Sequence, residues 1–278
     1  PNFQVSPEVK VLINIGALLD IPTGTYYTGI HGESILNGGL GMFTGITGPG
    51  NSFKSTMLHY MQLSALDKVL KTHQTYLSTY DSEVNIHKNR LQDFTQKFPD
   101  FQNRDIMTEG IWNITDKLIY FGNQWWKEHR EYLIELAKTI KDHMATTPFI
   151  DKKTGQLFRM PVPSFTSIDS FTEFDTEEVN NIQKDNELGD SGGNTIHMRM
   201  GLAKTRFLMD LPSICGRSNN YILMVAHLGQ DMQIGASPYA PQPPKKLPHL
   251  SSGQKLKGVT DKFFFLLSNL WQMFDARP

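Results

Sequence analysis

The hydrophobic residues of this chain fall into short runs of strand length that alternate with longer stretches of helical spacing. Runs rich in apolar, β-branched or aromatic residues occur at 42–46, 75–80, 164–168, 221–226 and 262–268. Stretches in which apolar side chains recur every three or four residues cover about 54–69, 123–145 and 198–211. Strands that alternate with helices predict an α/β protein with a mostly parallel, twisted sheet flanked by helices on both faces.

Two parts of the chain depart from this alternation. Residues 1–40 are rich in glycine and indicate an irregular N-terminal lead-in, which could contact a neighbouring subunit. Residues 41–278 are expected to form the core domain, with an insertion at about 123–162. Within the insertion, the segment Asp151–Gly155 has the turn chemistry of a protruding hairpin between 149 and 161.

Composition limits the classes of protein that fit. The chain has 278 residues, 39% of them hydrophobic, so it can bury a core without a disulfide or a structural metal. The single cysteine, Cys215, excludes disulfide frameworks and cysteine-rich zinc sites. No apolar run approaches the roughly 18 residues of a membrane span and no signal peptide is visible, so we expect a cytoplasmic protein without a membrane partner. With a net charge of −1, any nucleic acid must be held by local basic patches.

The most informative segment is the loop from Gly48 to Ser55, which reads GPGNSFKS. It follows a predicted strand and precedes a predicted helix, the context of a phosphate-binding loop of pattern G-x-x-x-x-G-K-[ST]. The first glycine, Lys54 and Ser55 match this pattern, but Phe53 replaces the second glycine. A side chain there is compatible with phosphate binding if the residue has helical φ and ψ, because its N–H donor is retained. An ordinary Gly/Pro turn with a polar cap is the simpler interpretation.

Polar residues follow three other predicted strands, at Glu83, Asp169 and His227. Parallel strands end at one edge of a sheet, where nucleotides bind in α/β proteins. At that edge Glu83 could orient the attacking water, Asp169 could hold Mg²⁺ through water, and His227 could sense the γ-phosphate. Each also has an ordinary explanation, as an acid at a helix start, a turn residue and a satisfied core or loop histidine. Their joint occurrence with Lys54 favours a single ATP site.

Three basic residues, Arg199, Lys204 and Arg206, lie on one predicted helical stretch. If they line a path for DNA, each phosphate contact adds to the salt dependence of binding. A solvated helix face explains the same three residues equally well.

With these residues in view, the chain resembles the RecA family of strand-exchange ATPases. It is most similar to the variant of T-even-type phages, whose phosphate loop also carries Phe before the Lys. The resemblance covers roughly residues 35–267. It implies a RecA-like P-loop ATPase core with ATP and Mg²⁺ as cofactors. The residues implied in nucleotide binding are Gly48, Pro49, Gly50, Asn51, Ser52, Phe53, Lys54, Ser55 and Thr56.

The same resemblance implies a role for each polar strand end. The segment 80–83 is similar to the strand end that bears the catalytic glutamate, here Glu83. The segment 168–170 is similar to the strand that supports Mg²⁺, so that Asp169 and Ser55 would hold the metal. The segment 225–227 resembles the strand whose terminal residue couples nucleotide to DNA. The implied catalytic residues are therefore Glu83, Lys54 and His227.

For DNA, the segment 188–191 resembles the first DNA-binding loop of the family, and the helix with Arg199, Lys204 and Arg206 follows it. The segment 229–256, with Lys245 and Lys246, occupies the place of the second loop. The resemblance implies an ATP-dependent recombinase that binds single-stranded DNA, forms head-to-tail homo-oligomers, and acts in recombination and repair in the cytoplasm, which is the host cytoplasm if the chain comes from a phage. The insertion, and the early end of the chain after its last core strand, depart from the family.

Two alternatives remain open. A replicative hexameric helicase shares the same core and a strand-end glutamate, and residues 227–230 partly imitate its sensor strand. A nucleotide-gated structural or annealing module would bind ATP with little hydrolysis. Closed rings in electron micrographs would indicate the helicase, whereas open filaments on single-stranded DNA would indicate the recombinase.

Overall fold

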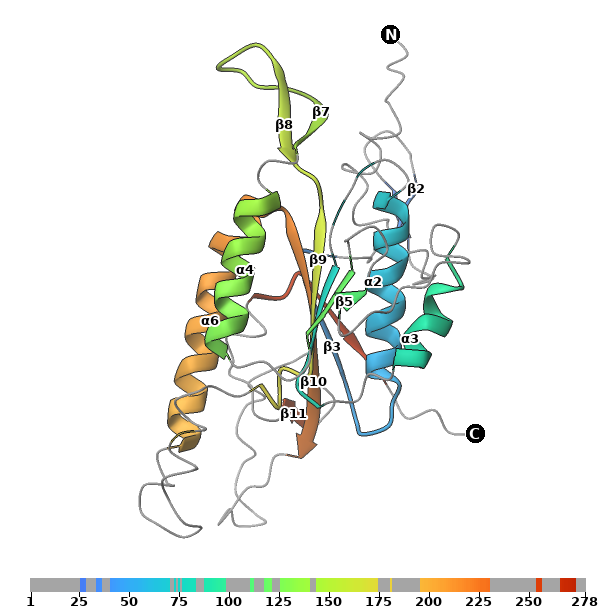
Figure 1. Cartoon of the computed structure of the whole chain (residues 1–278), viewed down its shortest axis with the longest axis vertical. Coiled ribbons are helices and arrows are strands. Elements are labelled where there is room, and N and C mark those ends of the chain that lie inside the picture. The colour runs from blue at the N-terminus through green and yellow to red at the C-terminus, as the bar shows by residue number, and fades with distance from the viewer. Residues whose placement is uncertain are drawn as a thin grey trace.

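The computed structural model describes residues 26–28, 34–36, 41–70, 73, 75, 77–83, 88–98, 111–112, 118–121, 126–140, 144–174, 181, 196–230, 254–256 and 266–273. A central sheet runs between two layers of helices (Figure 1). Its strand order is β12-β3-β10-β9-β4-β6-β5, with β11 added to β10. The strand bounds are β3 Phe43–Gly48, β4 Leu77–Asp81, β5 Ile111–Trp112, β6 Leu118–Phe121, β9 Ser164–Asp169, β10 Asn220–Gln230, β11 Gln254–Leu256 and β12 Asn269–Gln272.

All pairings among β12, β3, β10, β9, β4 and β6 are parallel, whereas β5 and β11 add to β6 and β10 in the antiparallel sense. Strands β3, β4 and β9 are buried along their whole length, although they contain several Ser and Thr residues. Their hydroxyls bond across neighbouring strands. Thr47 Oγ1 donates to Ala226 O at 2.9 Å, and Ser78 Oγ lies 3.0 Å from Thr166 Oγ1. These bonds explain how polar strands remain stable in the core.

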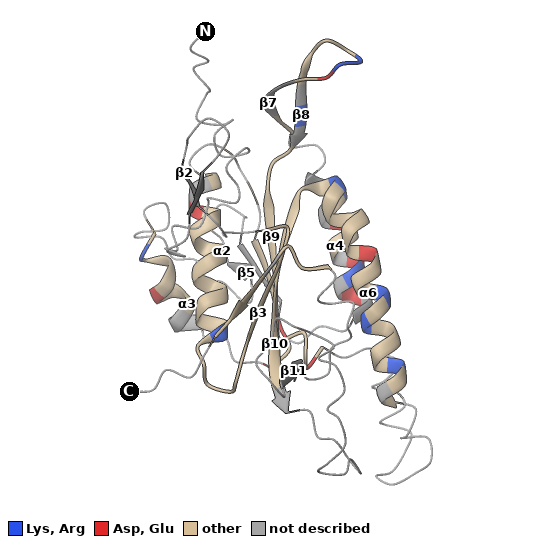
Figure 2. Ribbon diagram, turned by 180° about the vertical axis from the view of Figure 1, so that it is seen from behind, with Lys and Arg blue, Asp and Glu red and all other residues tan. Residues whose placement is uncertain are grey.

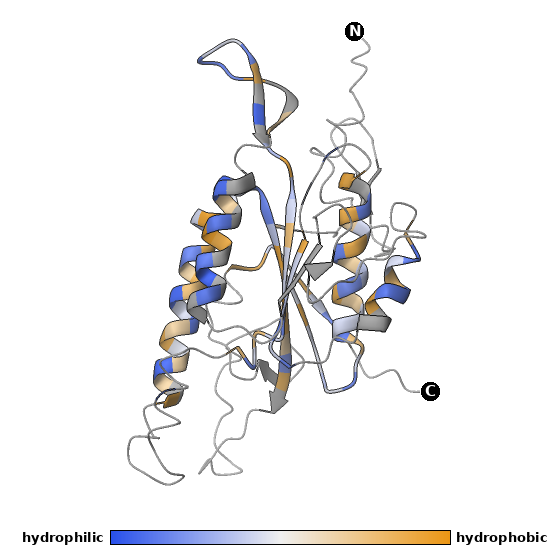
Figure 3. Cartoon of the chain, viewed as in Figure 1, coloured by the Kyte–Doolittle hydropathy of each residue, from blue (hydrophilic) through white to orange (hydrophobic). Residues whose placement is uncertain are grey.

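Helices cover both faces of the sheet, α2 Lys54–Leu70 and α3 Lys88–Thr95 on one side and α4 Trp126–Ile140 and α6 Ile196–Ser218 on the other (Figure 1). One buried cluster joins α2 to the sheet, including Leu58, Met61 and Leu66. A second cluster joins α6 to the sheet through Phe171, Phe174, Phe207 and Leu211. Hydrophobic and hydrophilic residues alternate along α4 and α6, as expected for helices with one covered face (Figure 3). The prediction of an α/β protein with a parallel sheet between helices is confirmed.

Two small antiparallel sheets lie apart from the central one. Strands β1 Tyr26–Thr28 and β2 Ser34–Leu36 pair within the predicted lead-in. Strands β7 Met144–Ile150 and β8 Leu157–Pro161 form the hairpin that the sequence predicts inside the insertion. This hairpin projects beyond the amino end of β9, away from the body of the sheet (Figure 1).

Three element boundaries differ from the sequence prediction. The helix expected at 123–145 ends at Ile140, because Met144 and Ala145 already belong to β7. Helix α6 extends to Ser218 through Pro212, because Leu211 and Cys215 beside the proline are fully buried and packing outweighs local propensity.

The last strand is also displaced from its predicted position at 262–268. It is β12, at Asn269–Gln272, whereas residues 266–268 are not in a strand and 262–265 lie outside the described residues. In a short run of apolar residues, the hydrophobic periodicity does not distinguish a strand from another kind of buried segment. Here Leu267 packs against β3, since a Cβ added to Gly45 would lie 2.7 Å from Leu267 Cδ1.

Candidate active site

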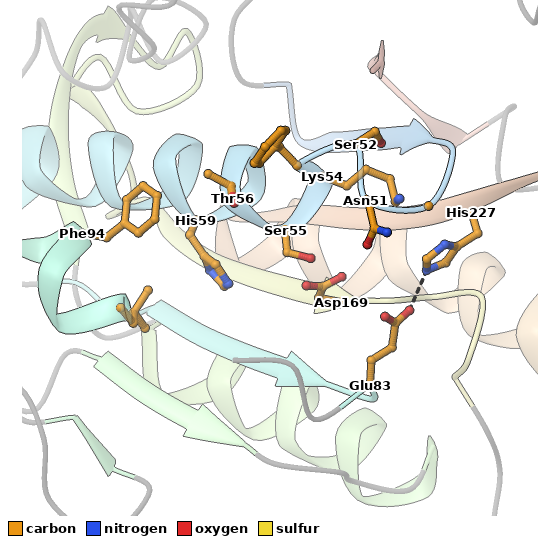
Figure 4. A pocket seen from close by; sticks show the side chains of 13 residues that line it. Asn51, Ser52, Lys54, Ser55, Thr56, His59, Glu83, Phe94, Asp169 and His227 are labelled. Carbon is orange, nitrogen blue, oxygen red and sulfur yellow. Dashed lines mark hydrogen bonds and ion pairs between the residues drawn. The ribbon is translucent and has the colours of Figure 1, made fainter. Parts of the chain in front are cut away.

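A cavity of about 580 Å³ opens at the carboxyl edge of the sheet, at the N-terminus of α2 (Figure 4). The loop residues Gly50–Thr56 line one side of it. The three polar strand ends singled out in the sequence, Glu83, Asp169 and His227, line it as well. Gly48, the last residue of β3, and Pro49 after it do not line the cavity. The structure therefore brings together, around one cavity, residues that lie up to 177 positions apart in the chain, from Gly50 to His227.

The loop between β3 and α2 is closed by its own hydrogen bonds. Ser52 Oγ donates to Pro49 O at 2.8 Å, and Met57 N donates to Phe53 O at 2.9 Å to begin the helix. Gly48 permits the close approach of the loop to the next strand: a Cβ there would lie 2.5 Å from Ser52 Oγ and 2.9 Å from the Cβ of Met273. A larger residue at position 48 would push the loop away from the sheet.

Phe53 does not have the helical φ that the sequence analysis set as the condition for a side chain at this position. Its φ is +59°, in the left-handed region where glycine is at ease and an aromatic residue is strained. Its side chain is 62% exposed, so little core packing offsets the strain. Phe53 thus has a backbone conformation that suits glycine, although its side chain is aromatic. Such strain costs on the order of 1–3 kcal/mol and is concentrated at functional sites.

The N-terminus of α2 is suited to an anion. The first N–H groups of an α-helix have no acceptor within the helix, and the helix dipole makes this end positive. The first turn of α2 contains no acidic residue that would neutralise it. Lys54, the first residue of the helix, is 5% exposed and donates from Nζ to Pro49 O at 2.6 Å. Burial lowers the pKa of Lys54, while the charges of Glu83 and Asp169 oppose that effect.

Asp169 is a buried carboxyl at the end of β9, in register with Asp81 of β4. It is 1% exposed, and its burial raises its pKa to about 6. A hydrogen bond with Ser55 and the charge of His227 lower the pKa, while the charges of Glu83 and Asp81 raise it. Its Oδ2 atom is buried and has no hydrogen-bond partner among the described residues. A buried polar atom of this kind calls for a water molecule or an ion.

Glu83 and His227 form a close pair at one end of the cavity (Figure 4). Glu83 Oε1 lies 2.6 Å from His227 Nε2 and accepts a hydrogen bond of 2.5 Å from Ser170 Oγ. Burial raises the pKa of Glu83, but the hydrogen bonds from Ser170 and His227, with the charges of His227 and Lys54, hold it below its ordinary value. Glu83 is therefore ionised at neutral pH. On its backbone side, His227 N donates to Thr172 Oγ1 at 2.8 Å.

Two site residues, Ser170 and Thr172, were missed by the sequence analysis. Ser170 joins the ends of β9 and β4: its N–H donates to Ser82 Oγ at 2.9 Å, and Ser82 Oγ donates back to Ser170 O at 2.8 Å. Ser82 N also donates to Asp169 O at 2.8 Å. The available signal was the hydroxyl residue Ser170 directly after a strand that ends in Asp, with Thr172 two residues later.

The far end of the cavity is lined by residues that no sequence pattern singles out. His59 of α2, with Leu91 and Phe94 of α3, lies at the end of the cavity away from Glu83 and His227 (Figure 4). His59 Nδ1 is 2.9 Å from Gln62 Nε2. These residues belong to ordinary amphipathic helices, so no pattern distinguishes them from core positions.

The basic residues predicted to bind DNA separate into different environments. Arg199 and Arg206 are exposed on α6. Lys204 is 1% exposed: Nζ donates to Thr172 O at 2.7 Å and lies 5.7 Å from the centroid of the Phe171 ring. Five residues of helix turn Lys204 about 140° away from Arg199, so in this structure it points toward the sheet and does not share the exposed face of Arg199. Lys245 and Lys246 lie outside the described residues.

Comparison with known proteins adds no family. No protein-family model matches the chain, and no curated protein matches it. Within the described residues, no helix has both the length and the apolar character needed to cross a membrane.

Proposed function

We propose that this chain is a RecA-like P-loop ATPase that hydrolyses Mg-ATP and acts on DNA as a strand-exchange recombinase. The observation that carries the proposal is the convergence of Lys54, Glu83, Asp169 and His227 on one cavity at the N-terminus of α2. The cavity thus combines the positive end of a helix, the ammonium group of Lys54, a carboxyl group of Asp169 that could bind a metal ion, and a carboxylate of Glu83 that could position a water molecule. Transfer of a phosphoryl group to water requires this set, since its catalysis is mainly positioning and charge stabilisation.

The end of β9 fits a divalent cation. Asp169 Oδ2 is buried and has no hydrogen-bond partner among the residues that the structure describes, and Mg²⁺ takes oxygen ligands. Ser55 and Asp169 would hold the ion, which when bound would neutralise negative charge on the phosphate oxygens. Among the described residues, no group of three or more His, Cys, Asp or Glu side chains is arranged for a metal. Water and phosphate oxygens would therefore complete the coordination, as is usual for Mg²⁺ at nucleotide sites.

The loop from Gly48 to Thr56 would surround the phosphates. Residues 50–56 line the cavity at the helix N-terminus, where their N–H groups would donate to phosphate oxygens. Lys54 would exchange its bond with Pro49 O for phosphate oxygens. Since that carbonyl is a neutral acceptor, a phosphate would be the stronger partner for the ammonium group.

Glu83 is the residue proposed to position the attacking water and accept its proton. Its low pKa keeps it ionised, and Ser170 and His227 hold one of its oxygens in place. A positioned general base contributes about 10²–10⁴ in rate. His227 connects Glu83 to β10 and, through its backbone N–H, to Thr172. We assign it the role of transmitting the state of the nucleotide to the segment that follows β10.

The DNA part of the proposal is supported by the exposed Arg199 and Arg206 on α6 and by Lys245 and Lys246 in the sequence. Seven residues of helix bring Arg199 and Arg206 to within about 20° of the same face, so one strand of phosphates could contact both. Single-stranded DNA and further copies of the chain, in a head-to-tail oligomer, are the proposed partners.

The experiment that tests this function is ATP hydrolysis measured with and without single-stranded DNA across a salt series. We expect hydrolysis that DNA stimulates, with stimulation that declines as salt rises. Hydrolysis that DNA does not affect would refute the DNA function. Electron microscopy of the ATP-bound complex separates the alternatives, because open filaments are expected and closed rings would indicate a helicase.

A further inference from the structure

The hairpin of β7 and β8 takes no part in the proposed ATPase site. It precedes β9 at the amino edge of the sheet, whereas Asp169 ends β9 at the carboxyl edge. Six residues of strand separate these edges by about 20 Å. A ligand on the hairpin tip would therefore leave the cavity open.

The tip of the hairpin carries an exposed apolar pair. Ile150 and Leu157 face one another across the two strands, and they are 64% and 52% exposed. The two aliphatic side chains form a small exposed apolar surface at the end of the arm, which a partner could cover.

Three cations surround that pair, and one acid opposes them. Lys152, Lys153 and Arg159 are exposed, and Figure 2 shows basic residues in blue at the end and along one strand of the hairpin. Neither lysine forms an ion pair with a described residue. The single acid, Asp151, is engaged by the turn itself, because its carboxylate accepts from Lys153 N at 2.9 Å and from Thr154 Oγ1 at 3.0 Å. The tip therefore has a net positive charge within a chain whose net charge is −1.

The turn is built to hold its shape. Asp151 N donates to Gln156 O, Gly155 N donates to Asp151 O, both at 2.8 Å, and Gly155 has a φ of +69°. This closed turn fixes the backbone at Lys152 and Lys153 relative to the apolar pair, so little backbone entropy is lost when the tip binds.

We infer that the β7–β8 hairpin is an arm that binds duplex DNA. A two-stranded ribbon fits a groove of the duplex. The cations would contact phosphates on both sides, and Ile150 and Leu157 would enter the groove as apolar wedges. The inference extends the DNA function proposed above, but its test requires no nucleotide, so failure of the arm and failure of the ATPase are separate results.

The test is fluorescence anisotropy with a short labelled duplex, in a salt series without ATP, on the full chain. Replacing two lysines, in K152Q/K153Q, should reduce the slope of log affinity against log salt by about 2, since each phosphate contact contributes about 0.9. The control K97Q/K138Q removes the same charge from exposed lysines elsewhere and should leave the slope unchanged. I150S/L157S should weaken binding about tenfold at an unchanged slope, because it removes apolar burial and no charge.

Several outcomes would overturn the arm. The inference fails if K152Q/K153Q binds the duplex with the affinity and salt slope of the wild type. It also fails if the K97Q/K138Q control loses as much affinity and slope as K152Q/K153Q. A greater effect on single-stranded than on duplex DNA would place the hairpin in the proposed strand-exchange site instead. If the tip variants bind duplex DNA normally but no longer bind anionic phospholipid vesicles, the tip contacts a membrane instead. If they bind duplex DNA normally but have a changed sedimentation coefficient, the tip contacts a second copy of the chain.

Discussion

His227 Nε2 and Glu83 Oε1 lie 2.6 Å apart, although 144 residues separate them in the sequence. The bond joins His227, three residues before the last residue of β10, to the segment after β4, across the intervening strand β9. Ser170, at the end of β9, donates to the same carboxylate oxygen. Three neighbouring strand ends are thus joined through one oxygen of Glu83, and a nucleotide that displaces or strengthens any of these bonds would act on all three strands.

Glu83→Gln tests the role of that carboxylate. The amide has nearly the same shape but does not accept a proton, so we expect nucleotide binding to persist while hydrolysis falls by about 10²–10⁴. Single-turnover hydrolysis and binding of a non-hydrolysable analogue measure the two effects separately. Asp151→Asn, at the exposed hairpin turn far from the cavity, is the matched control and should hydrolyse ATP at the wild-type rate. An unchanged rate in Glu83→Gln would exclude Glu83 as the base.

Asp169→Asn should stabilise the protein while removing a metal ligand. The folded-state pKa of Asp169 is raised to about 6, above the value of 3.8 for an unperturbed group, so the folded state binds the proton more tightly. Stability therefore falls as pH rises from about 4 to 6, and at neutral pH the buried carboxylate costs on the order of 2–3 kcal/mol. The asparagine variant should melt several degrees higher at pH 7 without Mg²⁺ and nucleotide.

The pH dependence supplies the control for that variant. At pH 4, where Asp169 is protonated in the folded protein, wild type and variant should have similar melting temperatures. Mg²⁺ with nucleotide should raise the melting temperature of the wild type at pH 7 and affect the variant much less. A variant that is less stable than wild type at pH 7 would contradict the interpretation of Asp169 as a metal ligand held at the expense of stability.

Phe53→Gly should stabilise the chain by about 1 kcal/mol, because glycine adopts a φ of +59° without the clash of a Cβ. Phe53→Ala is the matched control, since it removes the ring but keeps the Cβ and therefore the strain. Urea denaturation of both variants measures the difference. If Phe53→Gly is destabilised as much as Phe53→Ala, the ring and not the backbone determines the stability of this loop.

Lys204→Met should destabilise the protein, whereas Arg206→Met should not. Lys204 donates to Thr172 O in the core, and its removal leaves that carbonyl without this donor, at a cost of about 1–3 kcal/mol. Arg206 is exposed, and surface changes of this kind usually stay within about 0.5 kcal/mol. The effect on DNA should be the reverse: Arg206→Met should lower the salt slope for single-stranded DNA, and Lys204→Met should not. Equal stability of the two variants would contradict the burial of Lys204.

The sheet and the position of the site could be predicted from the sequence, because each rests on a local pattern. Runs of apolar residues located β3, β4, β9 and β10, and the polar residue after each run marked the edge where Glu83, Asp169 and His227 meet. The carboxyl ends of parallel strands lie at the same edge of the sheet. The order of strands and polar residues along the sequence was therefore sufficient to predict that these side chains lie close together.

The other features of the fold and the site depend on tertiary contacts, which no local sequence pattern indicates. The left-handed φ of Phe53 is imposed by the closed turn between β3 and α2. Lys204 is drawn into the core by Thr172 O and the ring of Phe171, against the usual preference of lysine for solvent. The last strand lies at Asn269–Gln272, after the most apolar run, because Leu267 of that run packs against β3.

The central claim is that the cavity at the N-terminus of α2 binds a Mg²⁺-bound nucleoside triphosphate. Isothermal titration calorimetry with a non-hydrolysable ATP analogue tests it most directly, on wild type and Lys54→Ala, with Mg²⁺ and with a chelator. We predict binding by the wild type that requires Mg²⁺ and is lost in Lys54→Ala. No heat of binding in the wild type, or equal binding by both proteins, would contradict the claim.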